Sequence, residues 1–124
     1  MQLRDQSPDI AYGGCWGLFG GQTKGDEDLV ETLRRELLEE LNFNPGQLTF
    51  FTSIYYDLTP RGQERKFRAY FETPLSEGEY KGLTLNEGTG MALLPISDII
   101  SKKRVLSFDE YALRLFTDTV VGAG

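Results

Sequence analysis

A glycine-led acidic stretch at residues 20–43 constrains this chain more than any other part of its sequence. Two glycines open it, an acidic turn follows, and the segment then continues as LVETLRRELLEELNF. Asp28 followed by Glu31 is typical of a capping box, and Asn42 is suited to end a helix in a left-handed conformation. Because apolar residues recur between them at helical spacing, the sequence predicts a helix over about residues 28–41.

Three glutamates lie along one side of this helix, beside its apolar stripe. At about 100° per residue, Glu36, Glu39 and Glu40 fall within an arc of about 100°. The apolar stripe that borders them consists of Val30, Leu33, Leu37 and Leu41. A solvated acidic face is the ordinary interpretation of clustered glutamates, and it stays open at this point.

Two physical costs favour a bound cation over a plain acidic face. Glu36 and Glu40 repel each other at i and i+4, and no basic residue follows Arg35 within the helix to relieve them. Glu39 and Glu40 also occupy the last turn, where the helix dipole disfavours an exposed anion by about 0.3–1 kcal/mol. A cation would remove both costs. Carboxylates without Cys or His favour a hard ion such as Mg²⁺ or Mn²⁺.

The spacing of glycine, glutamate and arginine in this stretch resembles the Nudix box. Gly21 is followed by five residues, Glu27, seven further residues and then RELLEELNF at residues 35–43. The last glycine of the pattern is replaced by Asn42, the next most tolerant residue of a left-handed C-cap. Gly25 stands one place earlier than the glycine that usually precedes the first glutamate, which leaves the shape of the turn open. The preceding WGLFG also resembles the family's approach to the box.

The resemblance implies a metal centre on this helix. Glu36, Glu39 and Glu40 would be metal ligands, with the carbonyl of Gly20 as a further ligand, and Glu36 and Glu39 would be catalytic. In Nudix enzymes a glutamate on a loop distant from the box often joins the metal site or acts as the base. Glu87 is the best placed candidate, and a turn glutamate without a chemical role is the alternative.

Arg35 and Glu27 are expected to support this centre as part of the catalytic set. The resemblance implies that Arg35 pairs with a box glutamate and orients it, and that Glu27 supports the loop through such a pair. A plain ion pair between Arg35 and Glu31, four residues earlier, is the alternative.

Substrate contacts are expected on the loops and strands around the helix and at Gly21. Arg4 would contact a phosphate near the mouth of the cleft, and Arg68 would reach the substrate if the polar side of its strand faces the cleft. Trp16, together with Tyr12, would stack on a base or sugar. The plain alternatives are a surface cation, a solvated strand face and core aromatic residues.

The rest of the sequence predicts a mixture of strands and helices. Two alternating segments joined by a turn at residues 60–63 indicate an antiparallel hairpin, and a Ser-Phe-Asp-Glu capping box opens a last helix. The expected elements are strands at 47–58, 65–73 and 91–94, a polar connection at 74–90, a short helical turn at 97–101 and a helix from 107 to about 120. This order, with the resemblance, predicts an α+β fold: a Nudix-type α/β/α sandwich with a mixed sheet.

The N-terminal part of this fold is expected to be short. Residues 1–5 have the pattern of the tail of a strand, and residues 6–14 form a predicted loop. Nudix proteins usually carry more chain before the box, so the first strand is expected to be absent or shortened. Either the domain is minimal or it has lost an edge, and an open edge invites a homodimer.

Length and charge bound the classes of function. The 124 residues suit one domain, residues 1–124, and 13 basic against 19 acidic residues give a net charge of −6. Three basic and seven acidic residues within 21–43 contribute −4 of it, so a nucleic acid polymer is a poor candidate partner.

Cys15 is the single cysteine, which indicates a reduced, cytoplasmic setting and a small core residue rather than a reactive thiol. Neither an apolar run suited to a membrane span nor a leader pattern is evident.

These observations and the resemblance together predict a Mg²⁺- or Mn²⁺-dependent hydrolase. Its substrate would be a nucleoside diphosphate linked to another moiety: a nucleoside triphosphate, ADP-ribose or a nucleotide sugar. A non-catalytic Nudix-fold module that binds nucleotides or regulates is the alternative. The glycine spacings fit neither a Rossmann fingerprint nor a P-loop.

Overall fold

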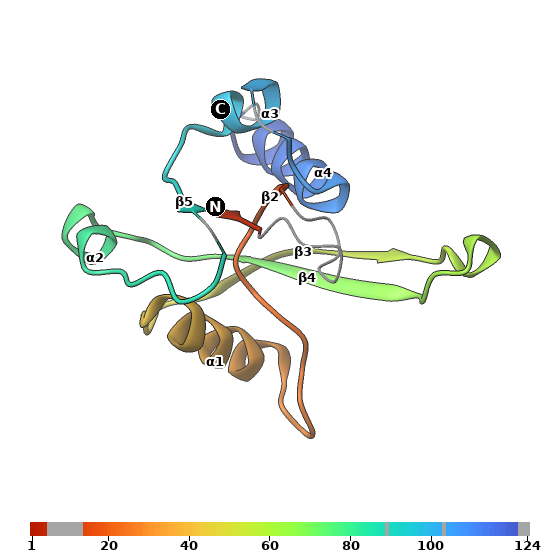
Figure 1. Cartoon of the computed structure of the whole chain (residues 1–124), viewed down its shortest axis with the longest axis horizontal. Helices are drawn as coiled ribbons and strands as arrows, with labels where there is room; N and C mark the ends of the chain where they lie inside the picture. The colour runs from red at the N-terminus through yellow and green to blue at the C-terminus, as the bar shows by residue number, and fades with distance from the viewer. Residues whose placement is uncertain (5–13, 89, 103, 122–124) are drawn as a thin grey trace.

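The computed structural model describes residues 1–4, 14–88, 90–102 and 104–121 of the chain (Figure 1). Its elements are, in chain order, β1 (Gln2–Leu3), β2 (Trp16–Gly17), α1 (Leu29–Leu41), β3 (Thr49–Tyr56), the 3₁₀ turn η1 (Thr59–Arg61), β4 (Lys66–Glu72), α2 (Glu77–Lys81), β5 (Gly90–Met91), α3 (Ile96–Lys102), α4 (Ser107–Phe116) and the π-helical turn η2 (Thr117–Val121). The predicted loop at 6–14 lies outside the described residues except for Gly14, and so does Tyr12. No helix within the described ranges is both long and apolar enough to cross a membrane.

Strands lie between two layers of helices. In Figure 1 the long β3–β4 hairpin runs across the molecule, with α1 on one side and α3 and α4 on the other. A second, smaller sheet has the order β2-β1-β5, with antiparallel pairs throughout, and Trp16 of β2 adds a parallel bridge to Val105. Two sheets between layers of helices confirm the predicted α+β class, and β1 is only two residues long, as expected of a shortened first strand.

Local capping explains why α1 starts and stops where the sequence predicts. The carboxylate of Asp28 accepts a hydrogen bond from the backbone N–H of Glu31 at 2.8 Å. At the other end Asn42 adopts a left-handed conformation with φ of 53°, and its N–H reaches the carbonyls of Leu37 and Leu38. The replacement of glycine by asparagine in the motif is therefore compatible with the same helix end.

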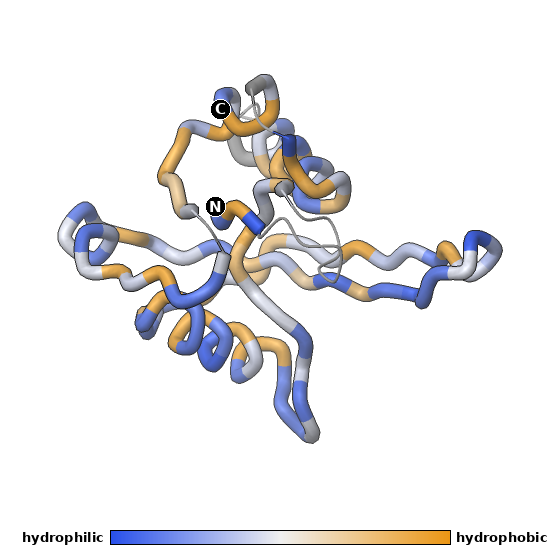
Figure 2. Tube along the Cα trace, in the orientation of Figure 1, coloured by the Kyte–Doolittle hydropathy of each residue, from blue (hydrophilic) through white to orange (hydrophobic). Residues whose placement is uncertain are grey.

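The main hydrophobic core forms between α1 and the segment that follows β4. Leu37, Leu41 and Phe43 are buried together. Partly buried residues packed against them are Phe19, Leu33, Leu75, Leu83, Leu85 and Met91. Val30, expected in the apolar stripe, is 36% exposed, because the first turn of the helix extends beyond this core. Figure 2 shows the contrast between the apolar inner side of α1 and the hydrophilic turn before it.

The β3–β4 hairpin departs from the simple alternation expected of it. The strands pair from Thr49 opposite Glu72 to Tyr56 opposite Lys66, with an irregularity in register between Phe50 and Thr52. Phe51 is the extra residue at this irregularity, and its side chain lies toward α4. Simple alternation would have placed it on the opposite side of the hairpin. The predicted single apolar face with Phe50 and Tyr56 on the same side is wrong for this reason.

Short elements account for the other differences from the sequence-based expectations. Residues 74–90, expected to be an irregular connection, contain α2, whose capping box joins Ser76 and Glu79; five residues are too few to show helical periodicity. The predicted capping box at Ser107 is also wrong. The helix is preceded by Leu106 without a side-chain cap, because pairing with Trp16 holds the chain extended up to this point.

Candidate metal centre

The loop that leaves β2 lies directly against one glutamate of α1. A Cβ atom added to Gly21 would lie only 2.2 Å from the carboxyl carbon of Glu36, a distance that no real side chain tolerates. A side chain at this position would therefore displace the Glu36 carboxyl from its present place against the loop backbone. Gly20, with φ of +154°, has open space where a side chain would project. The glycine pair thus brings the loop backbone and the helix carboxylates together.

Glu40 occupies the interior end of this arrangement. Its side chain is 1% exposed, and its Oε1 atom has no hydrogen-bond partner among the described residues. Burial, a hydrogen bond with the Glu36 carboxyl, and the charges of Glu87 and Glu36 raise its pKa to about 8, while the N–H of Gly20 lowers it. Transfer of a carboxyl group from water into an apolar medium costs roughly several kcal/mol when hydrogen bonds do not replace those to water. Such a cost is unusual in a residue that only folds the chain.

Arg35 gathers the surrounding carboxylates. Its Nε and Nη2 atoms donate to the two carboxylate oxygens of Glu27 at 2.6 and 3.1 Å. Nη1 donates to Glu36 at 2.9 Å and contacts Glu39 at 3.3 Å, and Nη2 also reaches the carbonyl of Gln22 at 2.9 Å. Arg35 therefore pairs with box glutamates, as the family resemblance implies, rather than forming only a simple pair within the helix.

Glu27 connects this arginine to the acidic turn. Besides Arg35, its carboxylate accepts hydrogen bonds from the backbone N–H of Lys24 at 2.8 Å and from the hydroxyl of Thr32 at 3.3 Å. Hydrogen bonding from Arg35 is the main reason that the pKa of Glu27 falls to about 2, and the Lys24 N–H contributes next. Glu27 thus stays ionised and holds the turn onto the helix, which is the geometry expected of a loop support.

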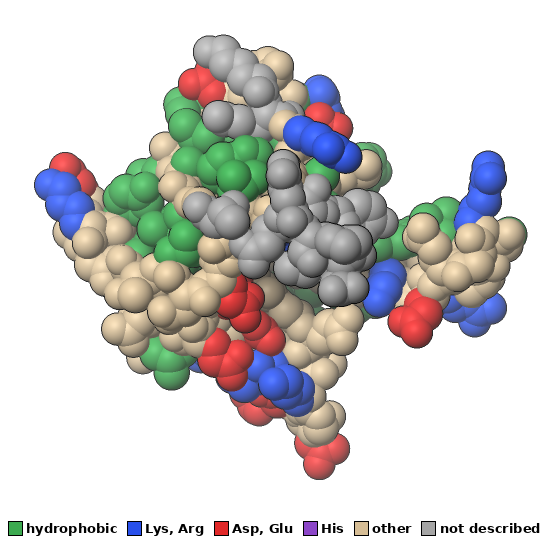
Figure 3. Space-filling view, viewed as in Figure 1, with side chains coloured by type: hydrophobic (Ala, Val, Ile, Leu, Met, Phe, Trp, Pro, Cys, Tyr) green, Lys and Arg blue, Asp and Glu red, His purple; other side chains and the backbone are tan. Residues whose placement is uncertain are grey.

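The third glutamate of the motif lies at the rim of this group. The Glu39 side chain is about half exposed, at 51%, and contacts Arg35 at 3.3 Å. Acidic and basic side chains gather on the lower part of the face shown in Figure 3, where α1 lies. Within the described ranges, no three acidic, Cys or His side chains already converge as a formed metal site. Two of the three predicted ligands, Glu36 and Glu40, are together, and the third is beside them.

A loop distant in sequence closes the group from the other side. The C-terminal turn of α1 is tied to residues 84–86 through its carbonyls. Thr84 N–H donates to Leu41 at 3.0 Å, Asn86 N–H to Glu40 at 2.8 Å and the Asn86 side chain to Glu39 at 2.9 Å. These bonds bring Glu87 close enough for its charge to raise the pKa of Glu40. A role for Glu87 stays a prediction. Asn86 was not predicted, because its sequence is that of an ordinary polar turn.

The family of the chain follows from a comparison with known proteins. The NUDIX domain model matches residues 3–116. This chain belongs to the Nudix family. Among solved structures, the MutT NUDIX hydrolase from Burkholderia pseudomallei has a TM-score of 0.72 at 21% identity, over 91% of this chain and 83% of that chain. The MutT protein from Methanosarcina mazei Go1 has a TM-score of 0.72 at 20% identity, over 92% and 79%. These likenesses show the fold; no curated protein sequence matches significantly.

Of the substrate contacts expected in this Nudix domain, Arg4 and Arg68 lie toward α4. The guanidinium of Arg68 stacks over the Phe108 ring, 3.7 Å from its centroid. Arg4 follows β1; burial raises the pKa of Asp109, and the charges of both arginines offset part of this rise. Trp16 is half-buried in β2, where its backbone pairs with Leu3 and Val105. These three residues lie with the second helical layer.

The same side of the hairpin holds a buried carboxylate that the sequence did not reveal as important. Asp109 is 3% exposed and accepts hydrogen bonds from the Leu18 N–H at 3.0 Å and the Tyr70 hydroxyl at 2.8 Å. Burial raises its pKa, which these two hydrogen bonds partly offset. A signal was present: Asp109 precedes Ala112 and Phe116 at i+3 and i+7, on the packing face of α4.

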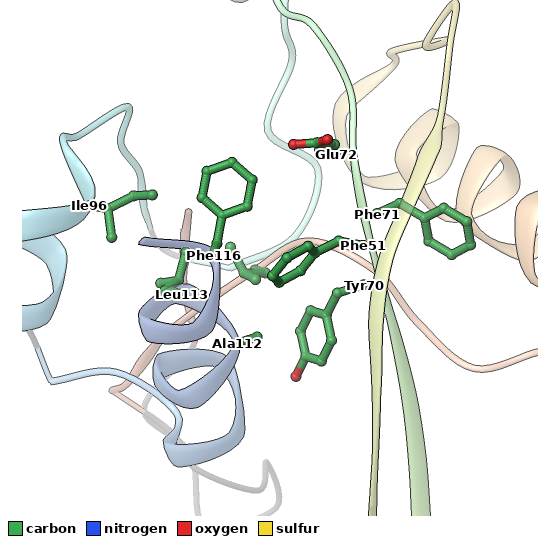
Figure 4. Close-up of a pocket in the computed structure, with 9 residues that line it drawn as sticks. Phe51, Tyr70, Phe71, Glu72, Ile96, Ala112, Leu113 and Phe116 are labelled. Carbon is green, nitrogen blue, oxygen red and sulfur yellow. The ribbon is translucent and has the colours of Figure 1, made fainter. Parts of the chain in front are cut away.

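An apolar cavity of about 180 Å³ adjoins this carboxylate network (Figure 4). Aromatic side chains from the hairpin and aliphatic ones from α3 and α4 form most of its walls. Figure 4 shows Phe51 and Tyr70 directed toward α4, whereas Phe71 points to the opposite side of the hairpin. Glu72 is the acidic residue among those lining it.

Proposed function

We propose that this Nudix domain is a metal-dependent hydrolase that cleaves the pyrophosphate bond of a nucleoside diphosphate linked to another moiety. Nucleoside triphosphates, ADP-ribose and nucleotide sugars belong to this class. The observation that carries the proposal is the buried carboxyl group of Glu40, with one oxygen unpartnered, against Glu36 and the Gly20 backbone. Family membership and the complete set of box glutamates support it.

The residues present fit a hard divalent cation. The Glu36 carboxyl lies close enough to Glu40 to raise its pKa, so two ionised carboxylates would repel each other here. A Mg²⁺ or Mn²⁺ ion would relieve the same repulsion, and the donors are all oxygen atoms. Glu36, Glu40 and Glu39, with the Gly20 carbonyl, would hold the ion. When bound, it would neutralise the diphosphate and lower the pKa of the attacking water.

The chain's own residues would hold the carboxylates in position and accept a proton from the attacking water. The Arg35 guanidinium binds Glu27 through two nitrogens and fixes the Glu36 carboxylate with a third, so the acidic side chains keep their places. Glu87 or a spare box carboxylate such as Glu39 would accept the proton from the water; both are exposed enough to exchange it with solvent. Gly21 leaves room for the Glu36 carboxyl and is the proposed phosphate contact on the loop.

The remaining assignments are part of this proposal. Arg4, Arg68 and Trp16 are the proposed contacts for the rest of the substrate. The partner is a nucleotide-type small molecule rather than a nucleic acid polymer, in keeping with the net charge of −6. A cytoplasmic location and a homodimer stay predictions.

Glutamine substitutions in α1 test the catalytic proposal. Glu36→Gln and Glu40→Gln keep the shape of each side chain but remove a ligand charge, so turnover should fall by at least about 100-fold. Glu31→Gln, on an exposed position of the same helix, is the matched control. The assay measures phosphate or monophosphate release from dNTPs, ADP-ribose and nucleotide sugars with Mg²⁺ or Mn²⁺. Near-normal turnover in the Glu36 and Glu40 variants would refute the assignment.

A calorimetric titration separates the enzyme from the non-catalytic module. The wild-type chain is titrated with Mg²⁺ and each nucleotide, and the same mixtures are then analysed for products. Product formation that depends on the metal supports the hydrolase. Nucleotide binding without any products across the panel would instead favour a binding or regulatory role.

A further inference from the structure

Three hydrogen bonds connect residues 16–18, which precede the Gly20–Gly21 loop of the candidate metal centre, to residues 104–109 at the start of α4. The Trp16 N–H donates to the Arg104 carbonyl at 2.7 Å, and the Leu106 N–H donates to the Trp16 carbonyl at 3.0 Å. The third contact differs in kind, because the Leu18 N–H donates to a carboxylate oxygen of Asp109 at 3.0 Å. At this position a side chain replaces the backbone as the acceptor.

The Asp109 carboxylate is itself held on its other side. Its second oxygen accepts the Tyr70 hydroxyl at 2.8 Å, so strand β4 and helix α4 are joined through it. Gly17 permits this approach, since a Cβ added there would lie 3.3 Å from Asp109 Oδ2 and 2.9 Å from a Leu106 methyl carbon. An ionised carboxylate, which only accepts, suits two donors. The buried group is thus built to hold the Leu18 backbone in place.

The held backbone leads at once into the candidate metal centre. From Leu18 the chain passes through Phe19, which packs on the core beside α1, to Gly20 and Gly21. Gly21 lies against the Glu36 carboxyl, and the Gly20 N–H is close enough to the Glu40 carboxyl to lower its pKa in part. A shift of the Leu18 backbone would therefore move the loop relative to both carboxyl groups.

We propose that Asp109 is a positioning residue for the metal centre: through the Leu18 N–H it sets the place of the Gly20–Gly21 backbone against Glu36 and Glu40. This inference rests on the proposed function, since it concerns the same site. It assigns to α4, which contributes no ligand, a role in metal affinity. Substitution of residues that orient a metal ligand typically changes metal affinity or activity by about 10- to 100-fold.

Three substitutions in α4 test this role. Asp109→Leu removes both acceptors at similar size. Asp109→Asn keeps an acceptor for the Leu18 N–H and offers an amide donor to the Tyr70 oxygen. Glu110→Leu is the matched control, because this neighbouring carboxylate pairs only loosely with Arg114, at 3.7 Å. Folding is checked by circular dichroism, and Mn²⁺ affinity is measured by electron paramagnetic resonance on the metal-free proteins without substrate.

The expected result is a graded loss of metal affinity. Asp109→Leu should raise the Mn²⁺ dissociation constant by about tenfold, whereas Asp109→Asn and Glu110→Leu should stay within about threefold of the wild type. Excess Mn²⁺ should then restore turnover to Asp109→Leu but not to Glu40→Gln. A folded Asp109→Leu protein with wild-type Mn²⁺ affinity would overturn the positioning role alone. If the wild type fails to bind Mn²⁺, or if Glu40→Gln binds it equally well, the proposed function fails instead.

A measurement on the wild type keeps the inference testable should Asp109→Leu not fold. In ¹H–¹⁵N spectra, the amide resonances of Leu18 and Gly20 should shift together as Mg²⁺ is added, and both shifts should saturate at the same concentration. Movement of the Gly20 resonance with an unchanged Leu18 resonance would show that the two are uncoupled and would overturn the proposal.

Discussion

The two faces of the β3–β4 hairpin solve different problems with different parts of the sequence. On the α1 side, charged groups only a few residues apart, from Glu27 to Glu40, form a network of ion pairs and repelling carboxyls. On the α4 side, aromatic rings, an apolar cavity and the carboxylate of Asp109 come from segments distant in sequence. The charged groups therefore come from one short stretch of sequence, whereas the packing on the other side joins segments that are distant in sequence.

This contrast explains how two regions can depend on each other without sharing a ligand. On the α1 side, Glu36 and Glu40 repel each other, a cost that a bound cation would remove. Because of this repulsion, contacts from outside the helix are needed to hold the two carboxyl groups in place. The β2 segment supplies that constraint, because its residues 16–18 are bonded to the start of α4 while Gly20 and Gly21 face α1. Substitutions on the α1 side should therefore change activity more than stability. Substitutions on the α4 side do the reverse unless they touch this connection.

The largest effect is expected from Gly21→Ala, which tests the close approach on the α1 side. The new Cβ would lie 2.2 Å from the Glu36 carboxyl carbon, so either the carboxyl group or the loop must move. We expect turnover to fall about 100-fold while the melting temperature changes little, since the Gly20–Gly21 loop is exposed and the Glu36 side chain is flexible. Gly46→Ala is the control, because a Cβ there meets nothing within 4 Å. Equal turnover in the two variants would contradict the geometry.

A smaller loss is expected from Arg35→Lys, which keeps the charge but not the fork of donors. Lysine is a point charge and cannot bind Glu27 through two nitrogens while also reaching Glu36. Turnover should fall about tenfold with little change in stability, because the pairs are partly exposed. Steady-state kinetics at saturating Mg²⁺ would measure it. A wild-type rate would show that positive charge alone is sufficient.

Tyr70→Phe tests the α4 side and should affect stability rather than turnover. It removes the hydroxyl that donates to Asp109 at 2.8 Å and leaves the Leu18 hydrogen bond in place. Loss of one such hydrogen bond to a buried carboxylate should lower the free energy of unfolding by about 1–2 kcal/mol. Urea denaturation measures this change, and Tyr111→Phe, at an exposed position of α4, is the control. An unchanged free energy of unfolding would indicate that water replaces the hydroxyl.

The sequence predicted the α1 side far better than the α4 side, and the reason is physical. The caps of α1, its length and the pairing of Arg35 with box glutamates depend on residues within about one helix of each other. Helix geometry and the motif spacing specify such contacts directly. The hydrogen bonds of Asn86 N–H to the Glu40 carbonyl and of Leu18 N–H to Asp109 join residues 46 and 91 positions apart. Those depend on how layers pack, which no local pattern in the chain records.

Two further features escaped prediction for similar reasons. The register irregularity at Phe51 changes which hairpin side chains face α4, and a bulge leaves no clear sign in an alternating sequence. Asp109 was hidden by its neighbours: within Ser-Phe-Asp-Glu it has the pattern of a solvent-facing first turn, whereas packing buries it. In both cases tertiary contacts decided between two locally equivalent conformations.

The smallest expected effect is a pH dependence of stability on the α1 side. The pKa of Glu27 is lowered from 4.5 to about 2, so its ionised form is favoured by folding. A carboxyl group whose pKa is lowered by folding stabilises the folded protein at pH values above its pKa in the unfolded chain. This contribution is lost as the pH falls from about 4.5 to about 2. Glu27→Gln should therefore lower the melting temperature slightly at pH 7 and have progressively less effect toward pH 2. Solvent near the pair keeps the difference small. Equal melting curves for both proteins at pH 7 would show that Arg35 finds equivalent partners in Glu36 and Glu39, so that the network, not one pair, holds the acidic turn.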